Sequence, residues 1–232
     1  MAQPFPVRGR GSASNPKNRF DSIETVPEPP QDGDEVSSPH TEFFPDRSKS
    51  IIAYNDSPDV GFDASINPYR GCEHGCVYCY ARPTHEYLGF SAGLDFETKI
   101  MVKEDAPELL RRELSGRNWK PQLVALSGNT DCYQPVEKKK RLTRRCLEVF
   151  LEFRNPVVII TKNFLVTRDA DILAELARYD CVGVTVSVTT LDPKLSSLLE
   201  PRASRPARRL AAIQTLAAAG VPVGYLQAPM IP

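Results

Sequence analysis

The sequence lacks any apolar run of the roughly 18–20 residues that a membrane-spanning helix needs, so no membrane partner is expected. It also lacks net charge, because 29 Lys and Arg residues balance 29 Asp and Glu residues; this excludes a globally basic nucleic-acid clamp but not a local basic patch. Residues 1–10 contain no apolar segment of the kind found in secretory signals. We therefore expect a cytoplasmic protein whose six cysteines stay reduced, so that a cysteine cluster indicates metal binding or catalysis.

Proline is unevenly distributed, and this divides the chain into two parts. Eight of the 21 prolines fall in residues 1–50, and residues 26–35 consist almost wholly of proline, acidic and other polar residues. Such a stretch buries too little apolar surface to offset the entropy lost on ordering. We predict a disordered N-terminal arm over residues 1–48, docked through Phe43 and Phe44, and one folded domain over residues 49–232.

Strand-like and helix-like segments alternate through the second part. Short apolar runs predict strands at residues 63–67, 122–126, 157–161, 182–189 and 221–228, and a further strand or extended connection at 96–102. Apolar residues at helical spacing predict helices at residues 106–114, 138–153, 169–179 and 206–219. This order is typical of βαβ units and predicts an α/β fold with a mainly parallel sheet. No helix follows the fifth strand, so an incomplete domain and an open doubly wound sheet are the alternatives.

The strongest signal is a loop that carries three cysteines in C-x3-C-x2-C spacing. They are Cys72, Cys76 and Cys79. Gly71 and Gly75 allow the backbone to wrap tightly around a bulky ligand. Three thiolates suit a [4Fe–4S] cluster that keeps one iron free of protein ligands. Zinc, with His74 as a fourth ligand, is one alternative, and a disulfide or a chance grouping is another.

The same loop has an aromatic residue before its third cysteine and follows the first strand of a β/α series, and in both respects it resembles the radical S-adenosylmethionine (SAM) enzymes. Further segments resemble the spore photoproduct lyase-like, or "DNA repair photolyase", branch of that superfamily. These segments are residues 55–62, 129–137, 199–203 and 228–232. The resemblance covers residues 41–232 and implies a partial (β/α)6 radical SAM barrel, with about five strands present and its C-terminal part missing. The branch is broad, so it does not fix a substrate.

The resemblance also implies a set of site residues. Cys72, Cys76 and Cys79 would hold the cluster, and SAM would chelate its open iron; reductive cleavage would give a 5′-deoxyadenosyl radical that takes hydrogen from the substrate. Tyr78 would pack beside the adenine, and Lys162 would pair with the SAM carboxylate. The other SAM-binding candidates are Gly128, Asn129 and Thr130 for the methionine amino group, Ser187 and Thr189 for the ribose, and Arg202 for the carboxylate or the substrate.

Cys132 follows the second strand of the series in a polar turn, at the strand end where ligands gather in α/β folds. Its thiol is a candidate for returning a hydrogen atom to a substrate radical, as one cysteine does in spore photoproduct lyase. Two basic runs, at residues 138–145 and 202–209, are candidates for holding nucleic-acid phosphates, although a solvated helix face is the favoured explanation of both.

Three hypotheses follow from the sequence. The first is a radical SAM enzyme, of lyase type, that receives electrons from a reductase, flavodoxin or ferredoxin and acts on an unknown substrate, damaged DNA being one candidate. The second is a cluster-binding protein without catalysis, or an inactive fragment. The third is a zinc-binding nucleic-acid module. Metal analysis separates the third from the others, and SAM cleavage separates the first from the second.

Overall fold

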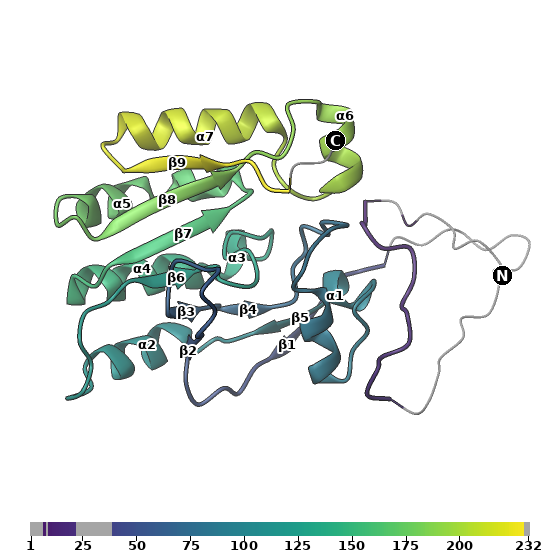
Figure 1. Ribbon diagram of the computed structural model, residues 1–232, viewed down its shortest axis with the longest axis horizontal. Coiled ribbons are helices and arrows are strands. Elements are labelled where there is room, and N and C mark those ends of the chain that lie inside the picture. Colours follow the sequence, from purple (N-terminus) through teal and green to yellow (C-terminus); the bar gives the residue numbers. More distant parts are fainter. Residues whose placement is uncertain (1–6, 8, 22–38, 230–232) are drawn as a thin grey trace, which may run out of the picture.

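The computed structural model describes residue 7, residues 9–21 and residues 39–229 (Figure 1). Its larger sheet has six strands in the order β2-β3-β6-β7-β8-β9. The strands are β2 (Ile52–Tyr54), β3 (Ala64–Ile66), β6 (Val124–Leu126), β7 (Val157–Thr161), β8 (Val182–Ser187) and β9 (Val223–Leu226). All neighbours pair in parallel except β2 and β3, which are antiparallel. The five predicted strands of the β/α series are therefore confirmed, and they lie in the sheet in their chain order. Over the described residues the sheet stays open, with β2 and β9 at its edges.

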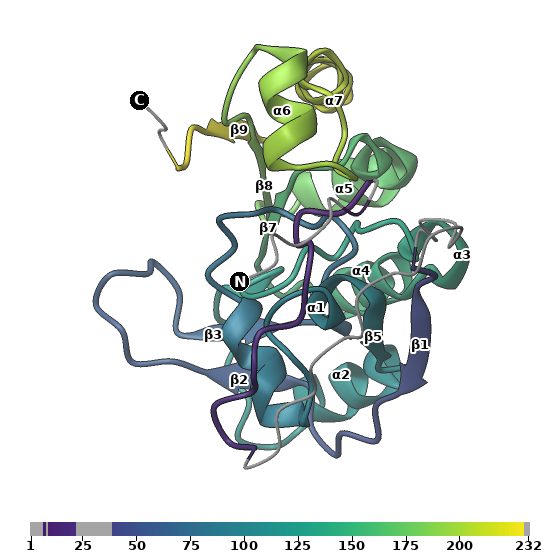
Figure 2. The same cartoon turned by 90° about the vertical axis from the view of Figure 1, so that its right-hand side faces the viewer.

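Helices cover one face of this sheet. They are α2 (Ala106–Leu114), α4 (Leu142–Phe153), α5 (Ala170–Ala177) and α7 (Pro206–Ala218). Figure 2 shows α4, α5 and α7 on the same side of β7, β8 and β9. Leu110, Leu147, Phe150 and Leu173 are fully buried between these helices and the sheet, because each helix repeats its apolar residues at three- and four-residue spacing. This helical layer holds the carboxyl ends of the strands at one edge, where the cysteine loop lies.

A second, three-stranded sheet of order β1-β5-β4 adjoins the cysteine loop. Its strands are β1 (Glu42–Pro45), β4 (Tyr69–Arg70) and β5 (Lys99–Val102). Five shorter helical elements complete the described fold. They are the 3₁₀ helices η1 (Arg82–Leu88) and η2 (Phe164–Asp169) and the α-helices α1 (Asp95–Thr98), α3 (Glu137–Lys140) and α6 (Pro193–Leu199). None of the helices in the described residues is long and apolar enough to cross a bilayer.

Three sequence-based element predictions were wrong in detail. The proposed strand at 96–102 begins as α1, and only β5 is extended, because Phe96 turns its ring into the packing around Cys72. The helix predicted over 138–153 is two helices, since Arg141 adopts a left-handed φ of 54° between α3 and α4. The helix predicted from 169 begins at Ala170, after the 3₁₀ helix η2, which extends to Asp169.

Much of the described part of the predicted arm is docked on the domain. β1 pairs in parallel with β5, so the expectation of disorder does not hold for Glu42–Pro45. The ring of Phe44 lies 5.8 Å from that of Phe90, whereas Phe43 is largely exposed. Residues 9–21 run beside α1 along the right-hand side of Figure 1. The disorder predicted for residues 26–35 falls outside the described residues.

Candidate functional site

The three cysteines of the C-x3-C-x2-C loop lie between β4 and η1, at the carboxyl end of the large sheet. The backbone N–H of Cys72 donates to the carbonyl of Phe96 at 2.9 Å, and that of Cys79 donates to the carbonyl of Cys76 at 3.3 Å. Cys72 and Cys76 are buried and Cys79 is partly exposed. The loop therefore presents three reduced thiols from a single tight turn of chain.

Two glycines give the loop its shape. Gly71 and Gly75 have φ values of 79° and 67°, in the left-handed region that other residues enter only at a cost. A Cβ on Gly71 would lie 2.9 Å from the carbonyl oxygen of Phe96, and one on Gly75 would lie 2.5 Å from Oε2 of Glu97. Backbone conformation and close packing thus both require glycine at these two positions.

The donor chemistry of the loop fits an iron–sulfur cluster. Burial, then the nearby Asp131 carboxylate and the other two thiols, raises the pKa of Cys72 well above its usual range; burial likewise raises the pKa of Cys76 to about 12. Positive iron offsets such a cost by binding the thiolate form. Within the described residues, no three His, Cys, Asp or Glu side chains are placed to hold one metal ion.

The segment after β6 holds one side of the cysteine loop. The side-chain oxygen of Gln134 accepts from the N–H of Glu73 at 2.9 Å, and its amide nitrogen donates to the carbonyl of Gly71 at 3.1 Å. The carboxylate of Glu73 accepts from the N–H of Val136 at 2.6 Å and pairs with Arg202 at 3.0 Å. All the polar groups of buried Gln134 that face the loop are thereby satisfied, which fixes Cys72 against the sheet.

His74, between the first two cysteines, joins the loop to the ends of β6 and β7. Its Nδ1 lies 3.2 Å from Oδ2 of Asp131, and its Nε2 lies 3.3 Å from the Asn163 amide nitrogen. Asp131 also accepts from Oγ1 of Thr161 at 2.8 Å and from the N–H of Lys162 at 2.8 Å. Burial alone would raise the pKa of Asp131, but the facing His74 and the backbone N–H donors hold it at about 2. In this structure His74 thus ties the cysteine loop to Asp131 and Asn163.

Four of the predicted SAM-binding residues meet around one buried carboxylate, Glu200. The hydroxyl of Tyr78 donates to Oε1 of Glu200, and Oγ1 of Thr189 donates to the same oxygen at 2.9 Å. Lys162 Nζ lies 3.1 Å from Oγ of Ser187 and 5.8 Å from the centre of the Tyr78 ring. The structure thus brings Tyr78, Lys162, Ser187 and Thr189 together beside the cysteine loop.

Glu200 is itself held by a buried arginine. Arg209 on α7 donates to Oε2 of Glu200, to the carbonyl of Ser204 at 2.6 Å and to that of Ser187 at 3.0 Å. Both members of the ion pair are almost completely buried. Burial raises the pKa of Glu200, but Arg209 and the Tyr78 hydroxyl outweigh it and hold the pKa below its ordinary value. Glu200 is consequently an ionised anchor for this group.

The segment predicted to hold the methionine amino group lies at the end of β6. The N–H groups of Asn129 and Thr130 both donate to Oδ1 of Asn67, at 3.0 and 3.1 Å. The Thr130 hydroxyl donates to the carbonyl of Tyr69 and is buried, whereas Gly128 and Asn129 remain partly exposed. The hydroxyl of Tyr80, just after Cys79, donates to the carbonyl of Gly128 at 2.7 Å. Gly128 and Asn129 are thus the accessible members of this segment.

Two predicted site residues lie apart from that group. The guanidinium of Arg202 faces Glu73 and Oγ1 of Thr41, on a cavity of about 600 Å³ that Arg10 and Lys139 also line. Cys132 is fully buried in the main hydrophobic core, with its N–H bonded to Oγ of Ser127 and its carbonyl accepting from Thr143.

The position of Cys132 corrects the sequence interpretation. The polar turn is present, but it places the thiol inward among β6, α4 and their neighbours. Burial and the Asp131 charge raise the pKa of the Cys132 thiol well above its usual value. The geometry therefore assigns Cys132 to the core, together with Cys146 on α4.

Half of the basic residues in the two runs form ion pairs. Arg144 pairs with Asp169 and Asp171, at 3.1 and 2.9 Å, and Arg145 pairs with Glu108 at 2.7 Å. In the second run Arg202 and Arg209 pair with Glu73 and Glu200, as described above. These contacts favour a structural role for the paired members of both runs.

Sequence reasoning assigned no role to three residues that organise the site. They are Glu73, Gln134 and Glu200. Each lies inside a segment already singled out by its resemblance or spacing, but nothing in a single sequence shows that its partner is 61 to 129 residues away. The sequence signal that could have identified these three residues is a polar side chain beside the cysteines or within an otherwise apolar turn.

Comparison with known proteins gives a consistent result. The sequence profile of the Radical SAM superfamily matches residues 66–232, more than half of the chain. Uncharacterized proteins of Mycobacterium bovis and Mycobacterium tuberculosis are 40% identical over 171 residues, covering 74% of this chain and 50% of theirs. An uncharacterized protein of Methanocaldococcus jannaschii is 29% identical over 168 residues, covering 72% of this chain and 60% of its own. The chain thus spans about half the length of the mycobacterial relatives.

Solved structures of spore photoproduct lyase share the fold. A variant with bound AdoMet and dinucleoside spore photoproduct matches with a TM-score of 0.54 at 21% identity, covering 81% of this chain and 50% of that one. The complex with dinucleoside spore photoproduct matches with a TM-score of 0.54 at 19% identity, covering 82% and 51%. At this identity the match concerns the fold alone.

Proposed function

The chain belongs to the radical SAM superfamily, and from that premise we propose that it holds a [4Fe–4S] cluster through Cys72, Cys76 and Cys79 and binds SAM beside it. The observation that carries the proposal is the convergence of the cysteine loop with Tyr78, Lys162 and their neighbours at one sheet edge. When bound and reduced, the cluster supplies the electron that cleaves SAM to methionine and a 5′-deoxyadenosyl radical, which abstracts hydrogen from the substrate.

The side chains of this chain would position SAM. Tyr78, anchored on Glu200, offers its ring beside the adenine, and Ser187 and Thr189 offer hydroxyls to the ribose. Lys162 has only a hydroxyl as its hydrogen-bond acceptor among the described groups, so its ammonium is available to the SAM carboxylate. Gly128 and Asn129 are the groups proposed to face the methionine amino group. Arg202 and Cys132 are left out of the proposed SAM contacts, because Arg202 pairs with Glu73 and Cys132 lies in the hydrophobic core.

A lyase-type reaction on damaged DNA is the substrate proposal. It is supported by the fold shared with spore photoproduct lyase, one solved form of which contains a dinucleoside spore photoproduct. Exposed Lys139 lines the cavity next to Arg202 and could contact phosphates. The proposal places the protein in the cytoplasm, where thiols stay reduced and a reductase, flavodoxin or ferredoxin can deliver the electron.

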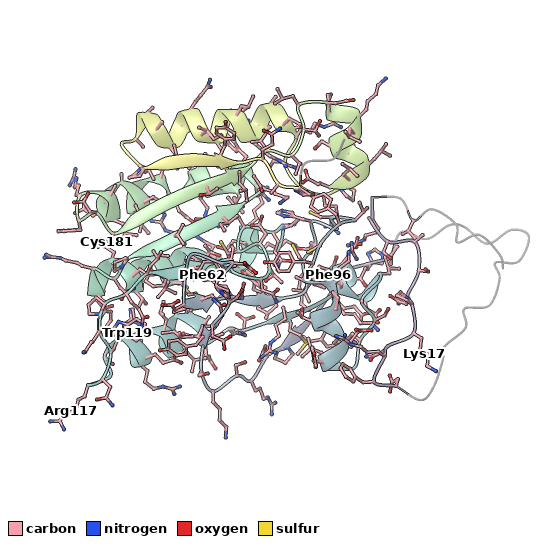
Figure 3. The ribbon with its side chains drawn as sticks, viewed as in Figure 1. Lys17, Phe62, Phe96, Arg117, Trp119 and Cys181 are labelled. Carbon is pink, nitrogen blue, oxygen red and sulfur yellow. The ribbon has the colours of Figure 1, made fainter. Side chains whose placement is uncertain are left out.

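The test is anaerobic reconstitution with iron and sulfide, followed by EPR of the reduced protein with and without SAM and by measurement of 5′-deoxyadenosine. We expect about four irons per chain, an EPR signal that changes on SAM addition, and 5′-deoxyadenosine formed only under reduction. Cys76→Ala should abolish all three. Cys181→Ala is the matched control, because Figure 3 shows Cys181 at the opposite end of the molecule from Phe96, which packs on Cys72.

The other possible results of this experiment distinguish the proposal from its alternatives. A cluster whose EPR signal ignores SAM would identify the second hypothesis, a non-catalytic iron–sulfur protein. Bound zinc without iron would refute the proposal. If 5′-deoxyadenosine forms, incubation with thymine-damaged oligonucleotides should consume the lesion; no consumption would reject the DNA substrate while leaving SAM cleavage in place.

A further inference from the structure

The N-terminal segment packs directly on the cysteine loop, about sixty residues earlier in the sequence. The backbone at Gly11 lies so close to Gly75 that a Cβ on Gly11 would stand 1.8 Å from the carbonyl oxygen of Gly75. A real Cβ never comes this close to backbone, so only glycine fits at position 11. Gly75 immediately precedes Cys76, so this contact covers the backbone of a proposed cluster ligand.

The buried carboxylate of Glu97 locks this contact. It accepts from the N–H groups of Gly11 and Ser12, both at 2.9 Å, and from Nη2 of Arg82 at 2.6 Å. Arg82 in turn donates two hydrogen bonds to the carbonyl of Cys76, at 3.0 and 2.9 Å. Glu97 is fully buried, which strengthens each of these charge-assisted bonds. A continuous chain of contacts therefore runs from the N-terminal segment to Cys76.

Further anchors fix the rest of the segment. Asn15 exchanges two hydrogen bonds with Asp95, through its amide nitrogen at 2.9 Å and its side-chain oxygen at 2.8 Å. Asn18 is buried and donates to the carbonyls of Glu86 and Phe90, both at 2.9 Å. A Cβ on Gly93 would lie 2.1 Å from the carbonyl oxygen of Ser14. These side chains bind backbone and carboxylate groups specifically, as an integral part of a fold does.

We propose that residues 9–18 form a wall of the cluster site, and that Glu97 is a positioning residue that holds both this wall and, through Arg82, the Cys76 backbone. The inference rests on the proposed function and extends the cofactor-holding unit beyond the region that matches the superfamily, which begins at residue 66. The wall excludes water from the Gly75–Cys76 side of the loop. Solvent exposure and hydrogen bonding around the ligands set both the retention and the reduction potential of an iron–sulfur cluster.

Three variants test the wall. Gly11→Ala inserts a Cβ where none fits, and Glu97→Gln keeps the shape of the side chain but removes its charge. Gly61→Ala is the matched control, because a Cβ at Gly61 meets nothing within 4 Å. Each variant is reconstituted anaerobically, and iron content, the rate of cluster loss to a ferrous chelator or air, and the midpoint potential are measured. Far-UV circular dichroism and thermal melting of the iron-free proteins report folding.

We expect Gly11→Ala and Glu97→Gln to lose iron at least about tenfold faster than wild type, because outer partners of metal ligands typically contribute that much to retention. Their midpoint potentials should become more positive, since entering water stabilises the more negative reduced cluster. Gly61→Ala should match wild type in both. Wild-type rates and potentials in a folded Glu97→Gln would overturn the inference even if Gly11→Ala misfolds. A wild-type protein that takes up no cluster would instead overturn the proposed function and this inference with it.

Discussion

Replacing Arg209 by methionine tests whether its buried ion pair with Glu200 stabilises the part of the site that is proposed to bind SAM. Arg209 donates to Glu200 and to the carbonyls of Ser204 and Ser187, and methionine of similar length removes all of these bonds. Removing one partner of a buried pair leaves an uncompensated charge and costs about 3–5 kcal/mol. Since domains are stable by only about 5–15 kcal/mol, Arg209→Met should lose a large share of the folding free energy.

Urea denaturation followed by circular dichroism measures this loss. With a slope of about 1–3 kcal/mol per molar urea, the midpoint should fall by at least about 1 M. Arg208→Met is the matched control: Arg208 is the exposed neighbour on α7, where its guanidinium stacks 3.5 Å from the Phe164 ring centre, and its loss should cost under about 1 kcal/mol. Equal midpoints for the two variants would refute the assignment.

The pH dependence of folding stability is a second test of the Arg209–Glu200 ion pair. Because the folded pKa of Glu200 is held below its unfolded value of 4.5, the carboxylate contributes stability above that pH, and this is lost as pH falls through the folded pKa. Without Arg209, burial instead raises the Glu200 pKa, so the variant regains stability on protonation. The gap between the unfolding free energies of Arg209→Met and wild type should therefore narrow as pH falls from 7 through about 4.5, first because the variant regains stability and then because wild type loses it. A gap that stays constant from pH 7 to pH 4 would show that lost packing, and not charge, causes the destabilisation.

Three further changes have defined outcomes. Gly75→Ala should lower iron content after reconstitution, because its φ of 67° and a Cβ 2.5 Å from Oε2 of Glu97 both oppose alanine; full iron content would contradict this. Cys132→Ala should destabilise the fold by roughly 1–2 kcal/mol in urea yet form 5′-deoxyadenosine at the wild-type rate, and a loss of that product without loss of stability would return Cys132 to the active site. Trp119→Phe removes the 3.0 Å bond from Nε1 to Oδ1 of buried Asn155 and should cost about 1 kcal/mol, whereas an unchanged midpoint would show that water replaces the donor.

The parallel sheet could be predicted from sequence because its signals are local. The residues 157–161 are a run of β-branched side chains bounded by polar ones, and β7 occupies exactly that range. The spacing of the cysteines is equally local, and it identified the loop before its surroundings were known. Predictions failed where a single backbone angle or a distant contact decides the outcome. Arg141 breaks one helix into two by adopting a left-handed φ that its residue type does not signal.

The site around the loop could be predicted only in part, for the same reason. Tyr78, Lys162, Ser187 and Thr189 were singled out one by one, but their common anchor Glu200 was not. The bond from Tyr78 to Glu200 spans 122 residues, and no periodic pattern encodes it. Likewise, the N-terminal segment has the polar composition of a disordered arm, yet specific bonds, such as those to Asp95 and Glu97, hold its described part on the domain.

The cysteine loop is fixed from several sides before any cofactor is considered. On one side Gln134 and the Val136 N–H hold Glu73; on the other, the N–H of Val77 donates to the carbonyl of Leu199 at 3.0 Å. Glu200, which accepts from the Tyr78 hydroxyl, directly follows Leu199 in the chain. A shift of this segment would therefore move the cysteine loop and the Tyr78–Glu200 group together. Under the proposed function, these shared protein contacts would place cluster and SAM relative to one another, as radical chemistry between two bound groups requires. Glu73 contacts one side of the cysteine loop and Glu97 contacts another. Both contacts should therefore be needed to keep the position of the loop relative to the Tyr78–Glu200 group.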